Sequence, residues 1–413
     1  MPDIPYDEEK AAAAVGIFDN LRVPDIPGQP TFGEVGGEWF RCILRPVFGA
    51  FDLSGIRIVS ELFLLVPKKN SKTTNSATMG IIWLCLNTTP NVKGVIAAPT
   101  QEVSQTCFDQ AKDMIELDPD LVTLFKVQDH LKKITHLVTK AELRIQTFDL
   151  TVTTGGIPAF VILDELHVMS SNPRATKILR QLRGGMLTNP MALLIIITTQ
   201  SMEPPAGVFK AELEYARSVR DGKVTKGRRV LAVLYEFSEA VQMDESRPWL
   251  NPAMWHLVTP NLNRSISLQA LIDDFDTEMQ KGLENEQIWL SQHLNIQPGM
   301  GTHSDRWIGA DHWPTASQSD LDLYQIMESS DVCVVGIDGG GLDDLLGAAV
   351  LGRHKETSVW QHWGRAWVDE EVKRLRPQIA ETLEDFERDG DLVFCQNGED
   401  DIVDLAMICR ELN

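Results

Sequence analysis

The feature that most constrains the fold is a series of short, continuous apolar runs that alternate with segments of helical periodicity. Four of these runs, within residues 61–200, are ELFLLVP, VKGVIAAPT, AFVILDE and MALLIIITTQ. Strands buried on both faces of a parallel sheet are apolar throughout, and helices make the crossovers between them. Helices are expected at residues 72–87 and 101–117. The sequence therefore predicts an α/β fold built on a parallel sheet.

Two further regions follow. Between about residues 200 and 330 the alternation loosens, with one helix expected at 268–283, which indicates the end of a domain and a linker. From Asp331 the runs DVCVVGIDGGG, LLGAAVLGR and TSVWQHWG predict three strands, followed by an acidic helix at about 370–388 and a strand, DLVFCQ. We therefore divide the chain into residues 1–250, 251–330 and 331–413.

Charge and composition exclude several functional classes. The 413 residues carry a formal charge of −21, which disfavours electrostatic binding of nucleic acid or an anionic membrane over the whole protein surface. A local basic channel for nucleic acid is still compatible with this charge. The six cysteines form no CxxC pair, so neither a zinc ribbon nor a disulfide scaffold is indicated. The start, MPDIPYDEEK, lacks the apolar region of a signal peptide, and no apolar run has the length of a membrane span. We expect a soluble, intracellular protein.

The polar turn after the first apolar run has features of a phosphate-binding loop. Residues 62–74, LFLLVPKKNSKTT, lead from a strand to Lys72 and Thr73 at a helix start. In a P-loop, backbone N–H groups hold the phosphates, the Lys reaches the β/γ oxygens and the hydroxyl binds Mg²⁺. Val66 and Ser71 stand where the motif has glycine, and a solvated basic turn explains the pattern equally well by itself. The candidate phosphate-binding residues are Lys68, Lys69, Asn70, Ser71, Lys72, Thr73 and Thr74.

Two adjacent carboxylates end the run FVILDE. Nucleotide hydrolysis needs one carboxylate for the Mg²⁺ shell and another to orient and deprotonate the attacking water. Asp164 suits the first role and Glu165 the second; the alternative is that both acids cap the next helix. His167 is expected to be a local structural or sensing residue rather than a metal ligand.

A third polar group follows the run IIITTQS. Polar residues at the tip of a buried strand lie where an α/β sheet meets its ligand. Thr198, Thr199 and Gln200 are therefore candidates to contact the γ-phosphate of ATP and transmit its loss to a moving segment. Thr and Gln also end many strands that bind nothing, so this motif gains weight only from its order after the other two.

The order VPKKNSKTT, FVILDELH, ITTQS resembles that of the large terminase subunit of tailed bacteriophages, the ATPase that drives DNA packaging. EWFRCILRPVFG, at residues 38–49, is similar to the family's adenine-side segment. Residues 254–275, 292–296 and 305–313 are similar to its linker, and VVGIDGGGLDDLLGAAVLG, at 334–352, is similar to the first strands of its RNase H-like nuclease. The resemblance implies a P-loop ATPase domain, a linker and a partial RNase H-like domain within the three regions above.

The resemblance also implies residue roles in the ATPase. Lys72 and Thr73 would contact the phosphates and Mg²⁺, Asp164 the metal, and Glu165 would be the catalytic base. Thr198, Thr199 and Gln200 would form the coupling motif. Lys68 stands where the family often has Arg. A lysine keeps the positive charge of that Arg but lacks the guanidinium that binds phosphate through two parallel hydrogen bonds. Phe40 stands where the adenine motif has Gln, so Phe40 or Trp39 is expected to stack on the base.

For the nuclease, the resemblance implies a two-metal site for Mg²⁺ or Mn²⁺. Asp338 would be the first metal ligand and a catalytic residue, with Asp344 in support; the alternative for Asp338 is an ordinary acidic turn. The family's other aspartates would follow residue 413, and the acids of residues 400–404 come too early to replace them. We expect this nuclease to be incomplete and unable to cut DNA.

The predicted function is ATP-driven translocation of double-stranded DNA in the cytoplasm of an infected bacterium. By resemblance, the partners are the small terminase subunit, the portal protein and further copies of the chain in a ring, with no membrane. Candidate DNA contacts are Lys226, Arg228 and Arg229, which a solvated loop explains more simply; candidate trans-acting arginines are Arg180 and Arg183. The alternatives are a helicase-like ATPase and a catalytically degenerate prophage relic.

Overall fold

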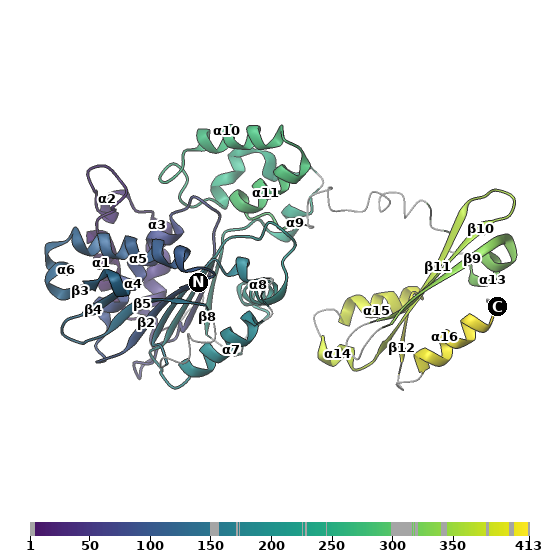
Figure 1. The fold of residues 1–413 in the computed structure, drawn as a ribbon, viewed down its shortest axis with the longest axis horizontal. Helices are drawn as coiled ribbons and strands as arrows, with labels where there is room; N and C mark the ends of the chain where they lie inside the picture. The colour runs from purple at the N-terminus through teal and green to yellow at the C-terminus, as the bar shows by residue number, and fades with distance from the viewer. Residues whose placement is uncertain are drawn as a thin grey trace. The chain divides into compact units, whose positions relative to one another are not determined.

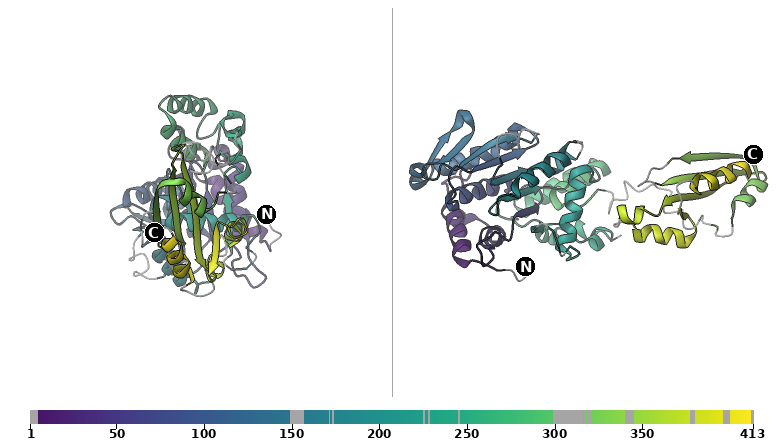
Figure 2. Two further views of the ribbon diagram at one scale, coloured as in Figure 1. Left: turned by 90° about the vertical axis from the view of Figure 1, so that its right-hand side faces the viewer. Right: turned by 90° about the horizontal axis from the view of Figure 1, so that it is seen from below.

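The computed structural model describes the chain in two compact units, Met1–Trp307 and Ile308–Asn413. The described residues are 5–148, 157–170, 172, 174–224, 226–227, 229–244, 246–298, 316, 318, 321–339, 345–376, 380–395 and 400–411. Asp344 and Arg228, two residues given candidate roles from the sequence, lie outside them. Each unit has its own hydrophobic core. Figures 1 and 2 show the helices and strands of each unit.

The first unit is built on an eight-stranded sheet with the order β3-β4-β5-β2-β6-β7-β1-β8. Six strands run parallel: β1 (Glu61–Leu65), β2 (Lys93–Ala98), β5 (Glu142–Thr147), β6 (Phe160–Asp164), β7 (Leu193–Thr198) and β8 (Val230–Leu234). An antiparallel pair, β3 (Phe125–Gln128) and β4 (Lys133–His136), extends one edge. Every residue of β1, β6 and β7 is buried. The predicted parallel α/β sheet is therefore confirmed.

Helices cover both faces of this sheet (Figure 1). Alternate side chains of a strand point to opposite faces, so Leu62 and Leu64 enter one core while Phe63 and Leu65 enter the other. The first core includes α1 (Glu8–Asn20), α3 (Glu38–Gly49), α4 (Lys72–Leu86) and α5 (Gln101–Glu116), with the short α2 (Phe32–Val35) and α6 (Pro119–Leu124) at its margin. The second core includes α7 (Ala175–Met186) and α8 (Gly207–Arg220). The sheet and the helical layer on each of its faces form three layers, and this packing fixes the positions of the loops at the carboxyl ends of the strands.

A separate small core lies in residues 237–298, which we call the helical subdomain. It contains α9 (Glu239–Gln242), α10 (Leu268–Met279) and α11 (Leu283–Leu294) (Figures 1 and 2). Three buried tryptophans, Trp249, Trp255 and Trp289, lie in its core. The single helix expected at 268–283 ends four residues early. Gly282, with φ of 108°, occupies a backbone region that only glycine adopts easily and allows α11 to begin in a new direction.

The second unit contains a four-stranded sheet with the order β12-β11-β10-β9. The strands β9 (Ser330–Asp338), β10 (Leu346–His354) and β11 (Trp360–Asp369) are antiparallel, and β12 (Leu392–Cys395) runs parallel to β11, which confirms the four strands expected here. The helices of its described residues are α13 (Leu323–Ser329), α14 (Val372–Leu375), α15 (Ala380–Asp389) and α16 (Asp400–Glu411).

The acidic helix expected at 370–388 is divided between α14 and α15. Pro377 follows Arg376, and a residue before proline avoids helical backbone angles; Arg376 accordingly has φ of −130° and ψ of 63°. In both units, no helix among the described ranges is long and apolar enough to span a lipid bilayer.

Candidate nucleotide-binding site

The three polar motifs of the first unit meet at one edge of the sheet. The phosphate loop follows β1, Asp164 ends β6 and Thr198 ends β7, and these strands are neighbours in the order β6-β7-β1. In open α/β sheets, ligands bind beyond the carboxyl ends of the strands, because loops from adjacent strands converge there. Motifs far apart in the sequence therefore form one site.

Lys72 lies at the centre of this site. It is the first residue of α4 and is 8% exposed. Its ammonium nitrogen, Nζ, donates a hydrogen bond of 2.7 Å to Thr199 Oγ1 and lies 3.7 Å from Glu165 Oε1. A buried ammonium is costly unless it is paired and hydrogen-bonded. The position at a helix N-terminus, beside two polar partners, makes Lys72 available to a phosphate group.

Asp164 and Glu165 have different electrostatic environments. Asp164 is 1% exposed, and burial together with the neighbouring Glu165 carboxylate raises its pKa to about 7. Burial would also raise the pKa of Glu165, but the side chain of His167 and the positive charge of Lys72 hold it below its ordinary value. Glu165 is therefore the carboxylate that stays ionised near neutral pH. Its backbone is left-handed, with φ of 56°, and its N–H donates to Asp164 Oδ1.

The residues around Asp164 fit a magnesium ion. Asp164 Oδ2 is buried and has no hydrogen-bond partner, whereas the Thr73 hydroxyl interacts with the same carboxylate. An orphan buried oxygen needs an explanation, and one reason for it is a bound ion. Mg²⁺ in nucleotide sites takes one or two protein oxygens together with phosphate oxygens and water. Thr73 and Asp164 supply oxygens of that kind.

His167 lies between the Glu165 side chain and the end of β7. Its Nδ1 atom lies 3.2 Å from Glu165 Oε2 and 3.2 Å from Thr198 Oγ1, and its backbone N–H donates to Thr198 Oγ1. The imidazole thereby fixes the orientation of the Glu165 side chain relative to the end of β7. This geometry agrees with the local structural or sensing role expected from the sequence.

The remaining predicted phosphate-loop residues form a tight turn between β1 and α4. Asn70 is completely buried, and its side-chain amide donates to the carbonyls of Pro67 and Lys68, each at 3.2 Å. Lys69 and Ser71 both have left-handed backbone, and Thr74 is half-buried in the first turn of α4. Neither of the two left-handed positions of this turn is a glycine.

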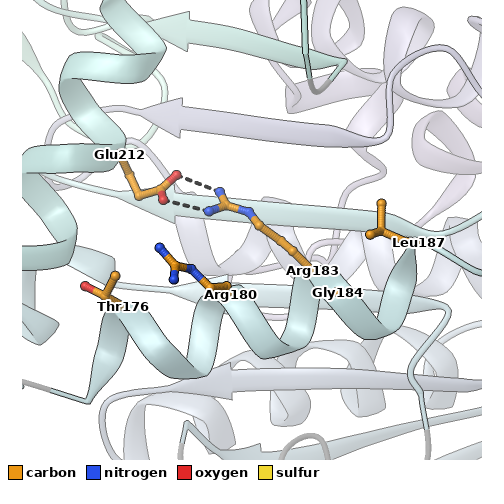
Figure 3. Close-up of a pocket in the computed structure, with 6 residues that line it drawn as sticks. All are labelled: Thr176, Arg180, Arg183, Gly184, Leu187 and Glu212. Atoms are coloured by element: carbon orange, nitrogen blue, oxygen red, sulfur yellow. Dashed lines mark hydrogen bonds and ion pairs between the residues drawn. The ribbon is translucent and has the colours of Figure 1, made fainter. Parts of the chain in front are cut away.

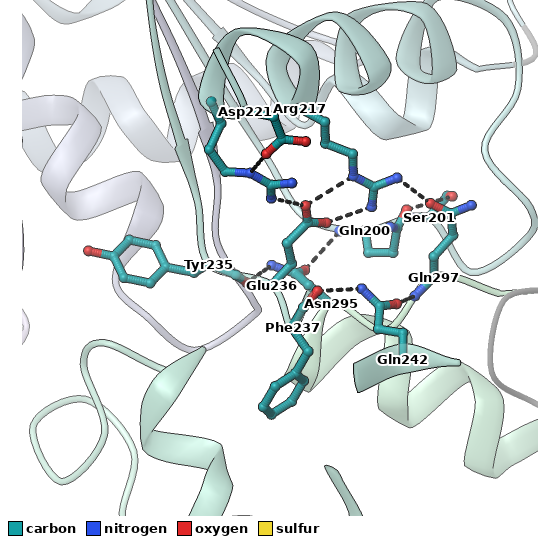
Figure 4. Close-up of polar contacts among 11 residues, drawn as sticks. Gln200, Ser201, Arg217, Asp221, Tyr235, Glu236, Phe237, Gln242, Asn295 and Gln297 are labelled. Atoms are coloured by element: carbon teal, nitrogen blue, oxygen red, sulfur yellow. Dashed lines mark hydrogen bonds and ion pairs between the residues drawn. The ribbon is translucent and has the colours of Figure 1, made fainter. Parts of the chain in front are cut away.

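The helical subdomain supplies residues that the sequence motifs did not identify (Figure 4). Asn295 accepts a hydrogen bond from Gln200 N through its Oδ1 atom and donates to Tyr235 O. Gln292 donates to Gln200 O and, through its own carbonyl, accepts from Lys68 N. The sequence placed Gln292 in a linker-like segment, and no local pattern signals its contacts.

The two aromatic residues considered for base stacking differ in their exposure. Phe40 is wholly buried, with its ring 5.4 Å from that of Phe18, so the prediction that it stacks on a base is wrong. The apolar face of α3 encloses it against α1. Trp39 is half-buried, packs edge-on against Tyr235 and donates to Asn261 Oδ1 at 3.2 Å.

The two candidate trans-acting arginines also differ (Figure 3). Arg183 is held between two carboxylates: its Nε donates to Glu61 Oε2 at 3.1 Å and its guanidinium forms two bonds of 2.6 Å with Glu212. This pairing gives Arg183 a structural role within the chain, and its candidacy as a trans-acting arginine stays a prediction. Arg180 is exposed in the same pocket, which Thr176 also lines.

The predicted nuclease residues do not form a metal site in the part of the second unit that the structure describes. Asp338 is exposed at the end of β9. Asp404 accepts a hydrogen bond of 2.7 Å from Trp367 Nε1, which gives it a structural role on α16. Among the described residues of the whole chain, no group of three His, Cys, Asp or Glu side chains is placed to hold a metal ion. The nuclease role of Asp338 stays a prediction.

Residues 38–218 match the family model described as the ATPase domain of the terminase large subunit. The chain carries a terminase ATPase domain. This confirms the family predicted from the sequence motifs. Lys72, Asp164, Glu165 and the segment 198–200 lie within the matched residues of this domain, whereas the helical subdomain lies beyond them.

One solved large terminase shares the fold of this chain, with a TM-score above 0.5. The crystal structure of the large terminase of bacteriophage HK97 is 17% identical and has a TM-score of 0.59, over 98% of this chain and 78% of that one. The large terminase of a thermophilic bacteriophage, in complex with ATP-gamma-S, is 13% identical with a TM-score of 0.38, over 86% and 75% of the two chains. No curated protein matches the sequence.

Proposed function

We propose that this terminase ATPase domain binds and hydrolyses Mg·ATP at the site around Lys72, and that the chain uses this reaction to translocate double-stranded DNA. The observation that carries the proposal is the convergence of a buried ammonium, an ionised carboxylate and an orphan carboxylate oxygen at one sheet edge. Each group matches one requirement of phosphoryl transfer: charge on the phosphates, activation of water and retention of a divalent ion.

The phosphates would occupy the N-terminus of α4. Backbone N–H groups and the helix dipole favour anions there, and the Lys72 ammonium would exchange its hydrogen bond with Thr199 for one with a phosphate oxygen. Thr73 and Asp164 would hold Mg²⁺, which when bound neutralises charge that develops on the phosphate oxygens. Glu165, kept ionised beside Lys72 and oriented by His167, would accept the proton of the attacking water.

The coupling step would begin at Thr199 and Gln200. A phosphate that draws Lys72 away from Thr199 changes the end of β7, and Gln200 follows directly in the chain. Gln292 on α11 and Asn295 at its end each form one hydrogen bond with Gln200, and Asn295 also donates to Tyr235 O. Loss of the γ-phosphate would therefore displace the helical subdomain. DNA contacts in such a motor are to phosphates and do not depend on sequence.

The proposal extends to the surroundings of the motor. The chain would act in the cytoplasm of the infected host, as a ring of copies, together with a small terminase subunit and a portal protein. The second unit would be the RNase H-like nuclease domain, with Asp338 at the end of its first strand as a metal ligand.

The test is steady-state Mg·ATP hydrolysis with and without double-stranded DNA, using wild-type chain, Glu165→Gln and Glu203→Gln. Glu203 is an exposed acid close to the end of the same sheet and serves as a matched control. Glu165→Gln should reduce kcat by about 10²-fold or more while nucleotide binding persists, and Glu203→Gln should leave both unchanged.

Three results would contradict the proposal. Undiminished hydrolysis by Glu165→Gln would remove the assigned base. Stimulation by single-stranded DNA alone would favour the helicase-like alternative. Absence of nucleotide binding by the wild-type chain would favour a catalytically degenerate relic.

A further inference from the structure

The phosphate loop contains two non-glycine residues in a backbone region that favours glycine. Lys69 has φ of 66°, and Ser71 has φ of 56° and ψ of 34°. Ser71 directly precedes Lys72, at the position where a P-loop has glycine. L-amino acids in this region are disfavoured by contact between Cβ and the following carbonyl, so they persist where surrounding structure holds them in place. The loop therefore needs an external constraint.

Asn261 and its segment of the helical subdomain provide contacts at each of these positions. The Asn261 side chain donates from Nδ2 to Ser71 Oγ at 3.2 Å, and its backbone N–H donates to Asn70 Oδ1 at 2.9 Å. Ser265, which also accepts from Asn261 Nδ2, donates to the carbonyl of Lys69. One segment thus contacts three successive residues of the loop. Asn261 itself is 7% exposed, so water competes little for the bonds that Asn261 makes.

Trp39 fixes the orientation of the Asn261 amide. An indole N–H can only donate, so the Asn261 atom that faces Trp39 Nε1 at 3.2 Å must be the carbonyl oxygen. The amide NH₂ group then points to the hydroxyls of Ser71 and Ser265. A side chain at Gly37 would lie 2.3 Å from Trp39 Cδ1 and 3.3 Å from Asn261 Oδ1, so a glycine is required for this close packing.

We propose that Asn261 is a positioning residue that holds the phosphate loop in its nucleotide-binding conformation, in place of the glycine that this loop lacks before Lys72. The inference rests on the proposed nucleotide site and adds that its affinity depends on a side chain of the helical subdomain. Because the loop is ordered before the nucleotide arrives, the ordering cost is removed from binding. Asn261 touches no predicted reacting group and acts through Ser71 and Asn70.

The test compares Mg·ADP affinity, by isothermal titration, for wild type, Asn261→Ala, Ser71→Gly and the double variant. Asn261→Ala should weaken binding about five- to tenfold. In the Ser71→Gly background the same change should weaken it less than about twofold, because glycine adopts the left-handed conformation without support. A residue that merely stabilises the subdomain would act by the same factor in both backgrounds.

Asn263→Gly is the matched control. Asn263 lies in the same segment with φ of 61° and caps the start of α10 through Leu268 N, and neither of these features involves the phosphate loop. Its variant should bind Mg·ADP as wild type does. Should Asn261→Ala not fold, Trp39→Phe is the substitute, because it removes the donor that orients the Asn261 amide. Trp39→Phe should lower Mg·ADP affinity by a smaller factor, and Ser71→Gly should suppress that loss as well.

The results that overturn the inference differ from those that overturn the proposed function. Wild-type affinity in Asn261→Ala, an equal loss in both Ser71 backgrounds, or the same loss in Asn263→Gly would each refute the role of Asn261. Wild-type chain that fails to bind Mg·ADP would instead refute the nucleotide site itself.

Discussion

Arg183 gives a prediction that separates a structural residue from a trans-acting one. Its side chain is 15% exposed and connects three elements: α7, on which it lies, Glu61 at the start of β1 and Glu212 on α8. Figure 3 shows its pairing with Glu212. Both carboxylates are largely buried, at 6% and 13% exposure. Replacement by alanine would leave two buried negative charges without this cation.

The structure sets the size of the expected effect. Removal of one partner from a buried ion pair costs about 3–5 kcal/mol, because the remaining charge is desolvated without compensation. Arg183 lines a surface pocket, so water can reach part of the cluster, and we expect about 3 kcal/mol. Arg180→Ala, which truncates an exposed arginine in the same pocket, should change stability by about 0.5 kcal/mol or less.

Hydrogen exchange measured by mass spectrometry is the suitable assay, because a chain of two units has no single free energy of unfolding. Peptides from β1 and α7 should open with a free energy about 3 kcal/mol lower in Arg183→Ala, while peptides of the second unit stay unchanged. A triple variant, Arg183→Met with Glu61→Gln and Glu212→Gln, should recover most of the loss, because it leaves no unpaired charge.

Two outcomes would refute the reasoning. A loss below about 1 kcal/mol would mean that solvent already compensates the carboxylates. Unchanged exchange in Arg183→Ala, combined with lost DNA-stimulated hydrolysis in mixtures with wild-type chain, would show that Arg183 serves a neighbouring subunit.

Three further predictions concern other parts of the chain. Asn295→Gly keeps the left-handed backbone at the end of α11 but removes the side-chain hydrogen bonds to Gln200 and Tyr235. Nucleotide affinity, measured by titration, should stay within about twofold of wild type, while kcat, measured by steady-state kinetics, should fall. Burial lowers the pKa of His293 to about 4, and the charged groups around it are Asp274, Lys68, Lys69 and Lys72. Because His293 takes up its proton at a higher pH in the unfolded chain than in the folded one, the stability of the first unit should decline by at most about 3 kcal/mol as pH falls from 6.5 to 4, and His293→Phe should flatten that decline in pH-dependent hydrogen exchange. Trp367→Phe removes the bond to Asp404 and should weaken protection of β11 and α16 by about 1 kcal/mol, with no effect on the first unit.

The sequence was sufficient for the central parallel strands of the sheet and for the groups that converge on its edge. Strands buried on both faces must be apolar throughout, which made β1, β6 and β7 recognisable, and parallel strands bring their carboxyl ends together. The meeting of Lys72 with Glu165 and Thr199 follows from those two facts. Phe40 shows where this reasoning failed: a motif position suggested a ligand contact, whereas the apolar face of α3 buries the ring.

The contacts from the helical subdomain could not be predicted in the same way. Asn261 meets Asn70 across 191 residues of sequence, and Asn295 meets Gln200 across 95. Single polar residues in an irregular segment carry no periodic signal, and their partners depend on how a separate core docks against the sheet. The missing glycine before Lys72 was the local sign that something distant must hold the loop.

The helical subdomain contacts the phosphate loop and the end of β7 at the same time, and this arrangement has a mechanical consequence. Gln292 accepts from Lys68 N through its carbonyl and donates to Gln200 O through its side chain, so one residue bridges the two loops that would contact a phosphate. Asn261 holds the phosphate loop at Asn70 and Ser71. A shift of either loop must therefore strain bonds to the subdomain. Because packed interfaces switch between discrete arrangements rather than deform continuously, small changes at the phosphates can become a rigid displacement of α10 and α11.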